Sequence, residues 1–193
     1  MDGGYVALLD VLGFSALVGE DTTGNKIRRY VACLENVTHQ ATVKYVVFSD
    51  SIVLTASDEG AEAFIAVAGA CSRLQWELLN EGIALRGAIA FGNFLRSAVA
   101  ESVFVAGRAV IDAYHFEQAQ KWVGVMVTPS ALEQVRDLDS RCRLEGFDSG
   151  SEILNLGYPG PHSFSTVTYR SMRRLRSSSH VLTDLQSCQR VAC

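Results

Sequence analysis

The sequence predicts an α/β sandwich, a sheet packed against helices, built as a single domain. Strand-like and helix-like segments alternate along the chain, with no internal repeat and no low-complexity linker between them. The chain has 193 residues, of which 48% are hydrophobic, enough to bury one proper core. We expect one domain over residues 1–193, with a core at about residues 4–140 and a C-terminal extension at about 141–193.

The first predicted element is a buried strand that ends at Asp10, within the run LLDVLGFSALV of residues 8–18. A tight turn containing Gly13 follows at once. The run NKIRRYVACLENV at residues 25–37 then predicts a helix, because its apolar residues recur at spacings of three and four. The inward face of that helix is expected to consist of Ile27, Tyr30, Val31, Leu34 and Val37.

A hairpin and a long helix follow. In VKYVVFSDSIVLTAS, residues 43–57, two β-branched runs are interrupted by Ser-Asp-Ser, which places Asp50 at or beside the tip of a hairpin. Residues 59–82 read as a helix, with Gly82 suited to the position after its C-terminus. Its predicted inward residues are Phe64, Val67, Cys71, Leu74 and Leu78.

The second half of the predicted core repeats this alternation. IALRGAIAFGNF at residues 83–94 is a strand, and residues 102–120 lead from a strand or loop into a helix at Gly107. WVGVMVTPS at residues 122–130 is a strand whose Thr128-Pro129 opens one more helix. Beyond about Arg141 the periodicity weakens, and residues 169–193 are interpreted as a surface helix or a loose tail.

Composition and charge exclude several classes of protein. A net charge of -4 and a pI near 5.6 argue against nucleic acid and anionic membranes as partners. The acidic start MDGGYVALLD lacks the positive charge of a signal peptide, and no apolar run reaches the ~20 residues of a membrane helix. Five cysteines without a CxxC pair fit reduced thiols better than disulfides. We expect a cytoplasmic protein.

Asp10 and Asp50 are the residues most suited to chemistry, since each stands where an apolar strand ends. If the hairpin pairs beside the first strand, the two carboxylates converge, and Mg²⁺ or Mn²⁺ would relieve their repulsion. Backbone N–H groups of the Gly13 turn could hold phosphate beside that metal, which suggests a nucleoside triphosphate substrate. The alternative is that Asp10 is a helix cap and Asp50 a hairpin-turn residue.

Four motifs, in order over roughly residues 4–120, resemble the class III nucleotidyl cyclases. LLDVLGFSALV resembles the opening motif of that family, and VVFSDSIVL resembles the hairpin with its second metal Asp, although Ser49 stands where Gly is usual. LRGAIAFGNF and VAGRAVIDAYHFEQ resemble the later Arg-containing strand and the Gly-to-helix segment. The residues within these four motifs are most similar to those of the pyrimidine cyclases of bacterial Pycsar antiphage systems.

The resemblance implies a ferredoxin-like, palm-type core with a mainly antiparallel sheet flanked by helices. It also implies a head-to-tail homodimer with two active sites at the interface. Asp10 and Asp50 would hold two divalent ions, Mg²⁺ or Mn²⁺, and the carbonyl of Val11 would complete one coordination shell. The triphosphate would be held by backbone N–H groups of the turn formed by Leu12, Gly13, Phe14 and Ser15.

The sequence departs from the family at the transition-state and base-recognition positions. Ile111 and His115 occupy the positions of the usual Asn and Arg, so Arg108, Arg96 or His115 could take the role of that arginine. The alternative for His115 is a packed or capping residue. The positions that read the base fall near Val46 and Phe104, whose bulk favours a one-ring base. Lys44 could contact the base or be an exposed strand residue.

These observations together predict a pyrimidine nucleotide cyclase. By the resemblance to the Pycsar cyclases, we expect UTP to be converted to cUMP, with CTP and cCMP as the alternative. The same resemblance implies that the product acts as an antiphage signal read by a separate effector protein. A competing hypothesis from another class is a catalytically inactive binding or dimerisation module on the same fold. A third is a purine cyclase with unfamiliar recognition residues.

Overall fold

The structure is a computed structural model of the chain. It describes the backbone of residues 2–40, 43–100, 102–135, 143–147, 151–155 and 167–170, and the side chains within residues 3–37, 43–100 and 102–135. The predicted helix or tail at residues 169–193 lies, apart from residues 169 and 170, outside the described residues.

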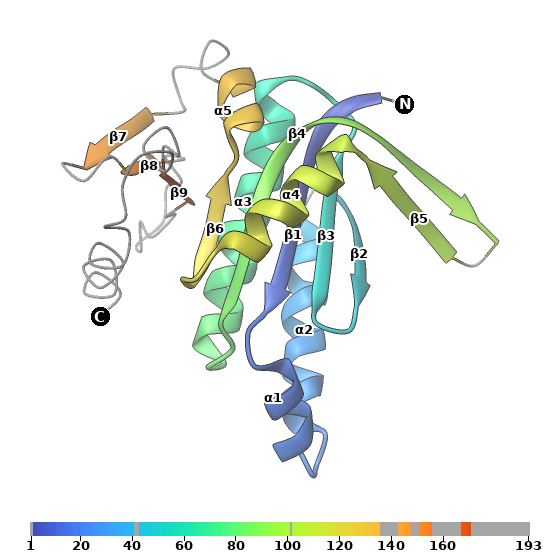
Figure 1. The fold of residues 1–193 in the computed structure, drawn as a ribbon. Helices are drawn as coiled ribbons and strands as arrows, with labels where there is room; N and C mark the ends of the chain where they lie inside the picture. The colour runs from blue at the N-terminus through green and yellow to red at the C-terminus, as the bar shows by residue number, and fades with distance from the viewer. Residues whose placement is uncertain are drawn as a thin grey trace.

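A mixed, mainly antiparallel sheet forms the centre of the molecule, as Figure 1 shows. Its strands lie in the order β2-β3-β1-β4-β6-β9-β8-β7, and β5 pairs with β4 off this path. The pairs β4–β6 and β6–β9 are parallel and the others antiparallel. The strands are β1 (Asp2–Val11), β2 (Lys44–Phe48), β3 (Ser51–Ala56), β4 (Leu85–Val99), β5 (Ser102–Gly107), β6 (Gly124–Val127), β7 (Arg143–Phe147), β8 (Ser151–Asn155) and β9 (Val167–Arg170).

Helices cover both faces of this sheet (Figure 1). Alternate residues of β1 divide between the faces: Tyr5, Ala7 and Leu9 enter the main core with α2 and α3, whereas Val6 packs with Ala109 of α4. The predicted α/β architecture is therefore confirmed. The helices are α1 (Phe14–Glu20), α2 (Asn25–Gln40), α3 (Ala61–Asn80), α4 (Arg108–Ala119) and α5 (Pro129–Val135).

The predicted elements of the core are confirmed, with two differences of detail. Gly82 follows α3 in the left-handed conformation, with φ 72°, as expected of a residue that ends a helix. Val31, predicted to face inward on α2, is 43% exposed, because the buried face is formed by Tyr30, Cys33, Leu34 and Val37 instead. The strand predicted at residues 83–94 continues to Val99 and pairs with β5 as a long hairpin.

The C-terminal region differs from the prediction as well. Residues 143–147, 151–155 and 167–170 form strands β7, β8 and β9, where the weak periodicity gave no strand. Strand β9 pairs with β6 and β8, and β8 also pairs with β7. Pairing with neighbouring strands, rather than a local sequence pattern, therefore defines these three strands. In the part of the chain that the structure describes, no helix is long and apolar enough to span a bilayer.

Candidate active site

The ends of β1 and of the β2–β3 hairpin bring Asp10 and Asp50 to the same place. Asp10 is the tenth residue of the chain and pairs with Ser51, the residue after Asp50. The backbone N–H of Val11 donates to the carbonyl of Asp50 at 3.0 Å, which fixes the turn of the hairpin against the end of β1. The sheet register thus places the two carboxyl-bearing residues on neighbouring segments.

The turn that carries Asp50 is supported from below by α2. The Tyr30 hydroxyl donates to the carbonyl of Ser49 at 3.3 Å, and burial together with the charge of Asp50 raises the pKa of Tyr30 to about 12. The hydroxyl therefore remains a donor at neutral pH. Ser49 itself has φ 58°, a left-handed conformation that glycine adopts most easily. This backbone conformation explains why Gly is usual at this position in the family that the motif resembles.

Arg86 and Glu117 form the other side of the site, and sequence reasoning assigned neither of them a role. Arg86 of β4 pairs with Asp10 in the sheet and reaches its carboxylate with Nη2–Oδ2 at 3.4 Å. Its Nε lies 2.6 Å from Glu117 Oε1, and Nη1 donates to the carbonyl of Gln120 at 3.2 Å. The signal that could have identified this pair is the position of Glu117, four residues after Ala113 on the same, inward face of α4. A carboxylate on a buried helix face needs a cationic partner.

Asp10 is held in a setting that disfavours its charge. Burial is the largest cause and raises the pKa of Asp10, and the nearby charge of Glu117 raises it further. Arg86 lowers the pKa of Asp10, and Asp50 raises it. The net upward shift of the pKa shows that Arg86 does not offset the combined effect of burial and the negative charges around Asp10.

Such a site fits a divalent cation by the chemistry of its donors. Asp10 and Asp50 supply carboxylate oxygens, the ligands that Mg²⁺ and Mn²⁺ prefer, and a cation would relieve the repulsion between them. The carbonyl of buried Val11 lies next in the chain. Among the described side chains no cluster of three or more Asp, Glu, His or Cys residues has metal-binding geometry, so the two aspartates would share the metals with backbone and substrate oxygens.

The predicted phosphate-binding turn lies directly after Val11. Gly13 has φ 72° and precedes α1, and no side chain caps that helix. The Leu12 N–H donates to the carbonyl of Ala84 at 2.9 Å and is therefore occupied. The N–H groups that have no partner within the helix belong to its first turn, which leaves Gly13, Phe14 and Ser15 as the donors of this turn.

Arg108 does not reach Asp10 within one chain. Gly107 pairs with Phe94, and Phe94 pairs with Asp2, so Arg108 lies at the opposite end of β1 from Asp10. Eight residues of extended strand separate the two ends, roughly 26 Å. The Arg108 side chain is 76% exposed and pairs with Asp112 at 2.9 Å.

His115 and Arg96 also lie away from the two aspartates. His115 is exposed on α4, with its ring against Tyr114 at a centroid distance of 5.9 Å. It is two residues from Glu117, so the helix directs the two side chains to opposite sides. Arg96 is in the part of β4 that pairs with β5, beyond Phe94.

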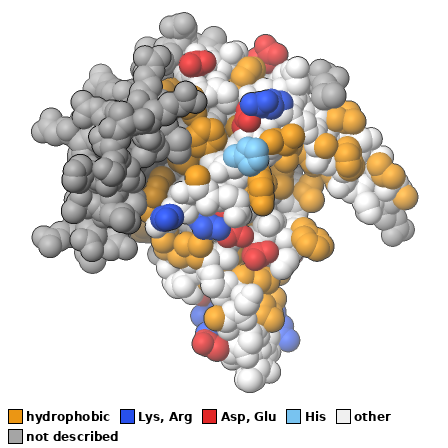
Figure 2. Space-filling view, in the orientation of Figure 1, with side chains coloured by type: hydrophobic (Ala, Val, Ile, Leu, Met, Phe, Trp, Pro, Cys, Tyr) orange, Lys and Arg blue, Asp and Glu red, His pale blue; other side chains and the backbone are white. Residues whose placement is uncertain are grey.

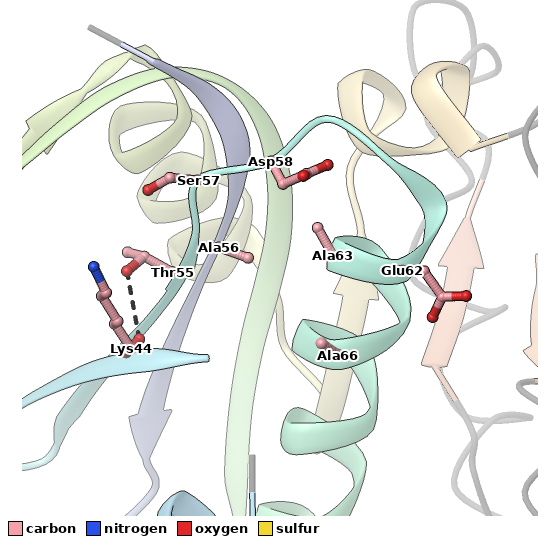
Figure 3. A pocket seen from close by; sticks show the side chains of 8 residues that line it. All are labelled: Lys44, Thr55, Ala56, Ser57, Asp58, Glu62, Ala63 and Ala66. Carbon is pink, nitrogen blue, oxygen red and sulfur yellow. Dashed lines mark hydrogen bonds between the residues drawn. The ribbon is translucent and has the colours of Figure 1, made fainter. Parts of the chain in front are cut away.

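The predicted base-recognition residues are spread over two hairpins. Val46 pairs with Val53, which pairs with Leu8, so it lies two residues along the sheet from Asp10 and is half-buried. Lys44 lies farther along, where it lines a pocket of about 300 Å³ with residues of β3 and α3, shown in Figure 3. Phe104 is on β5 and is 52% exposed.

Large apolar side chains are exposed around α4 and the two hairpins. Figure 2 shows hydrophobic side chains gathered on the face of the molecule that carries α4 and on the β4–β5 hairpin. A folded monomer rarely exposes so many large apolar side chains on neighbouring elements, which indicates a contact surface. The exposed residues on these elements are Tyr45, Phe48, Leu95, Val99, Val103, Phe104, Ile111 and Tyr114, at 40–81% exposure.

Comparison with known proteins identifies the fold. No protein-family model and no curated protein sequence matches the chain. The guanylyl cyclase domain of the RhoGC fusion protein of the aquatic fungus Blastocladiella emersonii superposes with a TM-score of 0.62 at 13% identity, over 77% of this chain and 89% of that one. The adenylyl cyclase CyaB of P. aeruginosa gives 0.57 at 14% identity, over 82% and 90%.

A third solved structure is a class III adenylyl cyclase-like ATP-binding protein of Pseudomonas aeruginosa. It superposes with a TM-score of 0.54 at 16% identity, over 69% of this chain and 34% of that one. At these identities the likeness shows the fold alone. The chain has the fold of the class III cyclase catalytic core.

Proposed function

We propose that this protein is a metal-dependent nucleotidyl cyclase that converts a pyrimidine nucleoside triphosphate, UTP before CTP, to its 3′,5′-cyclic monophosphate and pyrophosphate. The observation that carries the proposal is the meeting of Asp10 and Asp50 at the end of β1 in a cyclase-type fold. In the reaction the ribose 3′-oxygen loses its proton, bonds to the α-phosphorus, and displaces pyrophosphate.

Each part of the site has a role in this reaction. Asp10, Asp50 and the Val11 carbonyl would hold two divalent ions, which would supply acidification of the 3′-hydroxyl and neutralisation of the charge on the leaving pyrophosphate. The N–H groups of Gly13, Phe14 and Ser15 hold the phosphates at the start of α1. Arg108, His115 and Arg96 are the candidates for the cation that stabilises the developing charge, in place of the arginine usual in the family.

A head-to-tail homodimer would complete the site. Arg108 is separated from Asp10 by the length of β1, so the two can serve one substrate only if a second copy presents its α4 to the first. An antiparallel arrangement of two copies does this, because it places opposite ends of β1 together. The exposed apolar residues around α4 supply a surface for that contact, and a guanylyl cyclase domain of the same fold is described as dimeric.

The side chains at the predicted base-recognition positions favour a pyrimidine. Val46 and Phe104 offer apolar bulk where a purine cyclase would need polar groups to read the larger ring system. UTP and CTP differ at one donor–acceptor edge, and UTP is our first choice by resemblance. In the same line of argument the cyclic product is an antiphage second messenger for a separate effector protein.

The decisive test is incubation of the purified chain with ATP, GTP, CTP and UTP separately, with Mn²⁺ or Mg²⁺, and identification of products by mass and retention time. We expect one cyclic pyrimidine nucleotide from the wild-type chain and none from Asp50→Asn. Glu81→Gln is the matched control, since it removes a surface carboxylate that pairs with Arg29 at 3.1 Å. A cyclic purine product would contradict the substrate assignment.

A second candidate function is nucleotide binding without turnover. One protein of this fold is described as an adenylyl cyclase-like ATP-binding protein, which shows that the fold can serve binding. A folded dimer that binds a nucleotide but releases no pyrophosphate with any of the four substrates would favour this function over the cyclase.

A further inference from the structure

The Arg86 guanidinium contacts two carboxylates, those of Glu117 and Asp10, at different distances. The guanidinium Nε lies 2.6 Å from Glu117 Oε1, and Nη2 lies 3.4 Å from Asp10 Oδ2. The carbonyl of Gln120 accepts from the third nitrogen at 3.2 Å. Two of the three guanidinium contacts therefore come from α4 and the residue after it, and these are the shorter ones.

Glu117 is built into the interior to make this contact. Its side chain is 1% exposed on the face of α4 that packs against the sheet. Gln118 Nε2 donates to its second carboxylate oxygen, Oε2, at 2.8 Å. A carboxylate buried to this extent is costly without a cation, so its position depends on Arg86.

Without Glu117 the same guanidinium would compete for Asp10. An arginine prefers a bidentate pair with a carboxylate, and the fork of Arg86 is already beside Asp10. Moving fully onto Asp10 would neutralise a carboxylate that a divalent cation needs as its ligand. The contact with Glu117 is an ion pair at 2.6 Å, shorter than the 3.4 Å contact with Asp10, and this closer pairing opposes the movement.

We propose that Glu117 is a positioning residue that holds Arg86 against α4 and so keeps the Asp10 carboxylate free to bind a divalent cation. The inference rests on the proposed function, because it takes Asp10 as a metal ligand. A purely structural role would be different: the ion pair would tie α4 to β4, and its loss would change stability without changing the metal affinity of the folded protein.

The experiment measures Mn²⁺ binding to the full chain by electron paramagnetic resonance, without nucleotide, beside thermal unfolding. We expect Glu117→Gln to weaken Mn²⁺ binding about tenfold, the lower end of the effect of removing a carboxylate behind a metal ligand. Glu81→Gln removes a carboxylate from a surface pair with Arg29 and should leave the Mn²⁺ affinity unchanged. Glu117→Asp retains the charge and should recover part of the loss.

A second variant keeps the test valid if Glu117→Gln fails to fold. In Arg86→Gln/Glu117→Gln the competing cation and its counter-charge are both absent, so Mn²⁺ affinity should lie within about threefold of the wild type. Wild-type affinity in a folded Glu117→Gln protein would overturn the inference. Equal weakening in the double variant would also overturn it, since Glu117 would then act without Arg86.

The two proposals fail in different ways. Mn²⁺ binding that Asp10→Asn does not weaken would remove the metal site and with it both proposals. Mn²⁺ binding that depends on Asp10, together with cyclic product and an unchanged affinity in Glu117→Gln, would remove only the inference about Glu117.

Discussion

The end of β1 and the exposed face of α4 differ in how far one chain builds them. At the end of β1, Asp10 and Asp50 are fixed by sheet register, by the Val11–Asp50 hydrogen bond and by Tyr30 beneath the turn. On α4, Arg108 and His115 are exposed, and Ile111 between them is 52% exposed. The difference teaches that one chain brings the two aspartates of the proposed site together, whereas its candidate cations lie exposed and apart from them.

The strongest test of this comparison is complementation between chains. We expect Asp50→Asn and the double variant Arg108→Ala/His115→Ala each to lose at least about a hundredfold of cyclase turnover. Mixed in equal amounts after separate purification, they should regain about a quarter of wild-type turnover, because half of the dimers would contain one intact site. Product formation by the mixture is the measurement, and a mixture as inactive as its parts would show that both halves serve one chain.

The next test breaks the contact surface itself. Ile111→Glu places a charge among the exposed apolar residues of α4, and we expect it to yield folded monomers and at least about tenfold lower turnover at micromolar protein. Analytical ultracentrifugation measures the dimer fraction. Val31→Glu is the matched control, because Val31 is 43% exposed on α2, which packs on the other face of the sheet. Equal dimer fractions in the two variants would place the contact elsewhere.

A smaller expected effect is the pH dependence of stability that Asp10 causes at the end of β1. Because the pKa of Asp10 is raised from its ordinary value of 3.8, the folded metal-free protein holds this proton more tightly than the unfolded chain. Stability is therefore lost as pH rises from 3.8 through the raised pKa. We expect metal-free Asp10→Asn to unfold about 2–5 °C above the wild type at pH 7, with the gap closing toward pH 4. A thermal melt series over pH measures it, and a gap that widens on acidification would contradict the sign.

The smallest expected effect concerns the turn before Asp50. Ser49 has φ 58°, which a glycine adopts without the penalty of a side chain, although glycine also gains more freedom on unfolding. Ser49→Gly should stabilise the protein by less than about 1 kcal/mol and leave turnover within about twofold. Chemical denaturation measures the first and initial rates the second. A marked destabilisation would mean that the Ser49 side chain is itself needed in the turn.

Much of the fold could be predicted from the sequence, because its elements are defined by local patterns. The spacing of Phe64, Val67, Cys71, Leu74 and Leu78 identified a buried helix face, and all five residues are fully buried. The Ser-Asp-Ser interruption located the β2–β3 turn at Asp50. Strands β7, β8 and β9 were missed since no local pattern distinguishes them, and long-range pairing decides their formation.

The sequence by itself determined the buried face of α3, the hairpin turn and the two aspartates as the residues suited to a metal. Only the tertiary structure decided that Arg86 and Glu117 pair beside Asp10, that the Leu12 N–H is occupied by Ala84, and that Arg108 lies a strand length from the aspartates. The physical reason is range. Periodicity and turn chemistry act over a few residues, whereas an ion pair between residues 86 and 117 depends on how β4 and α4 pack.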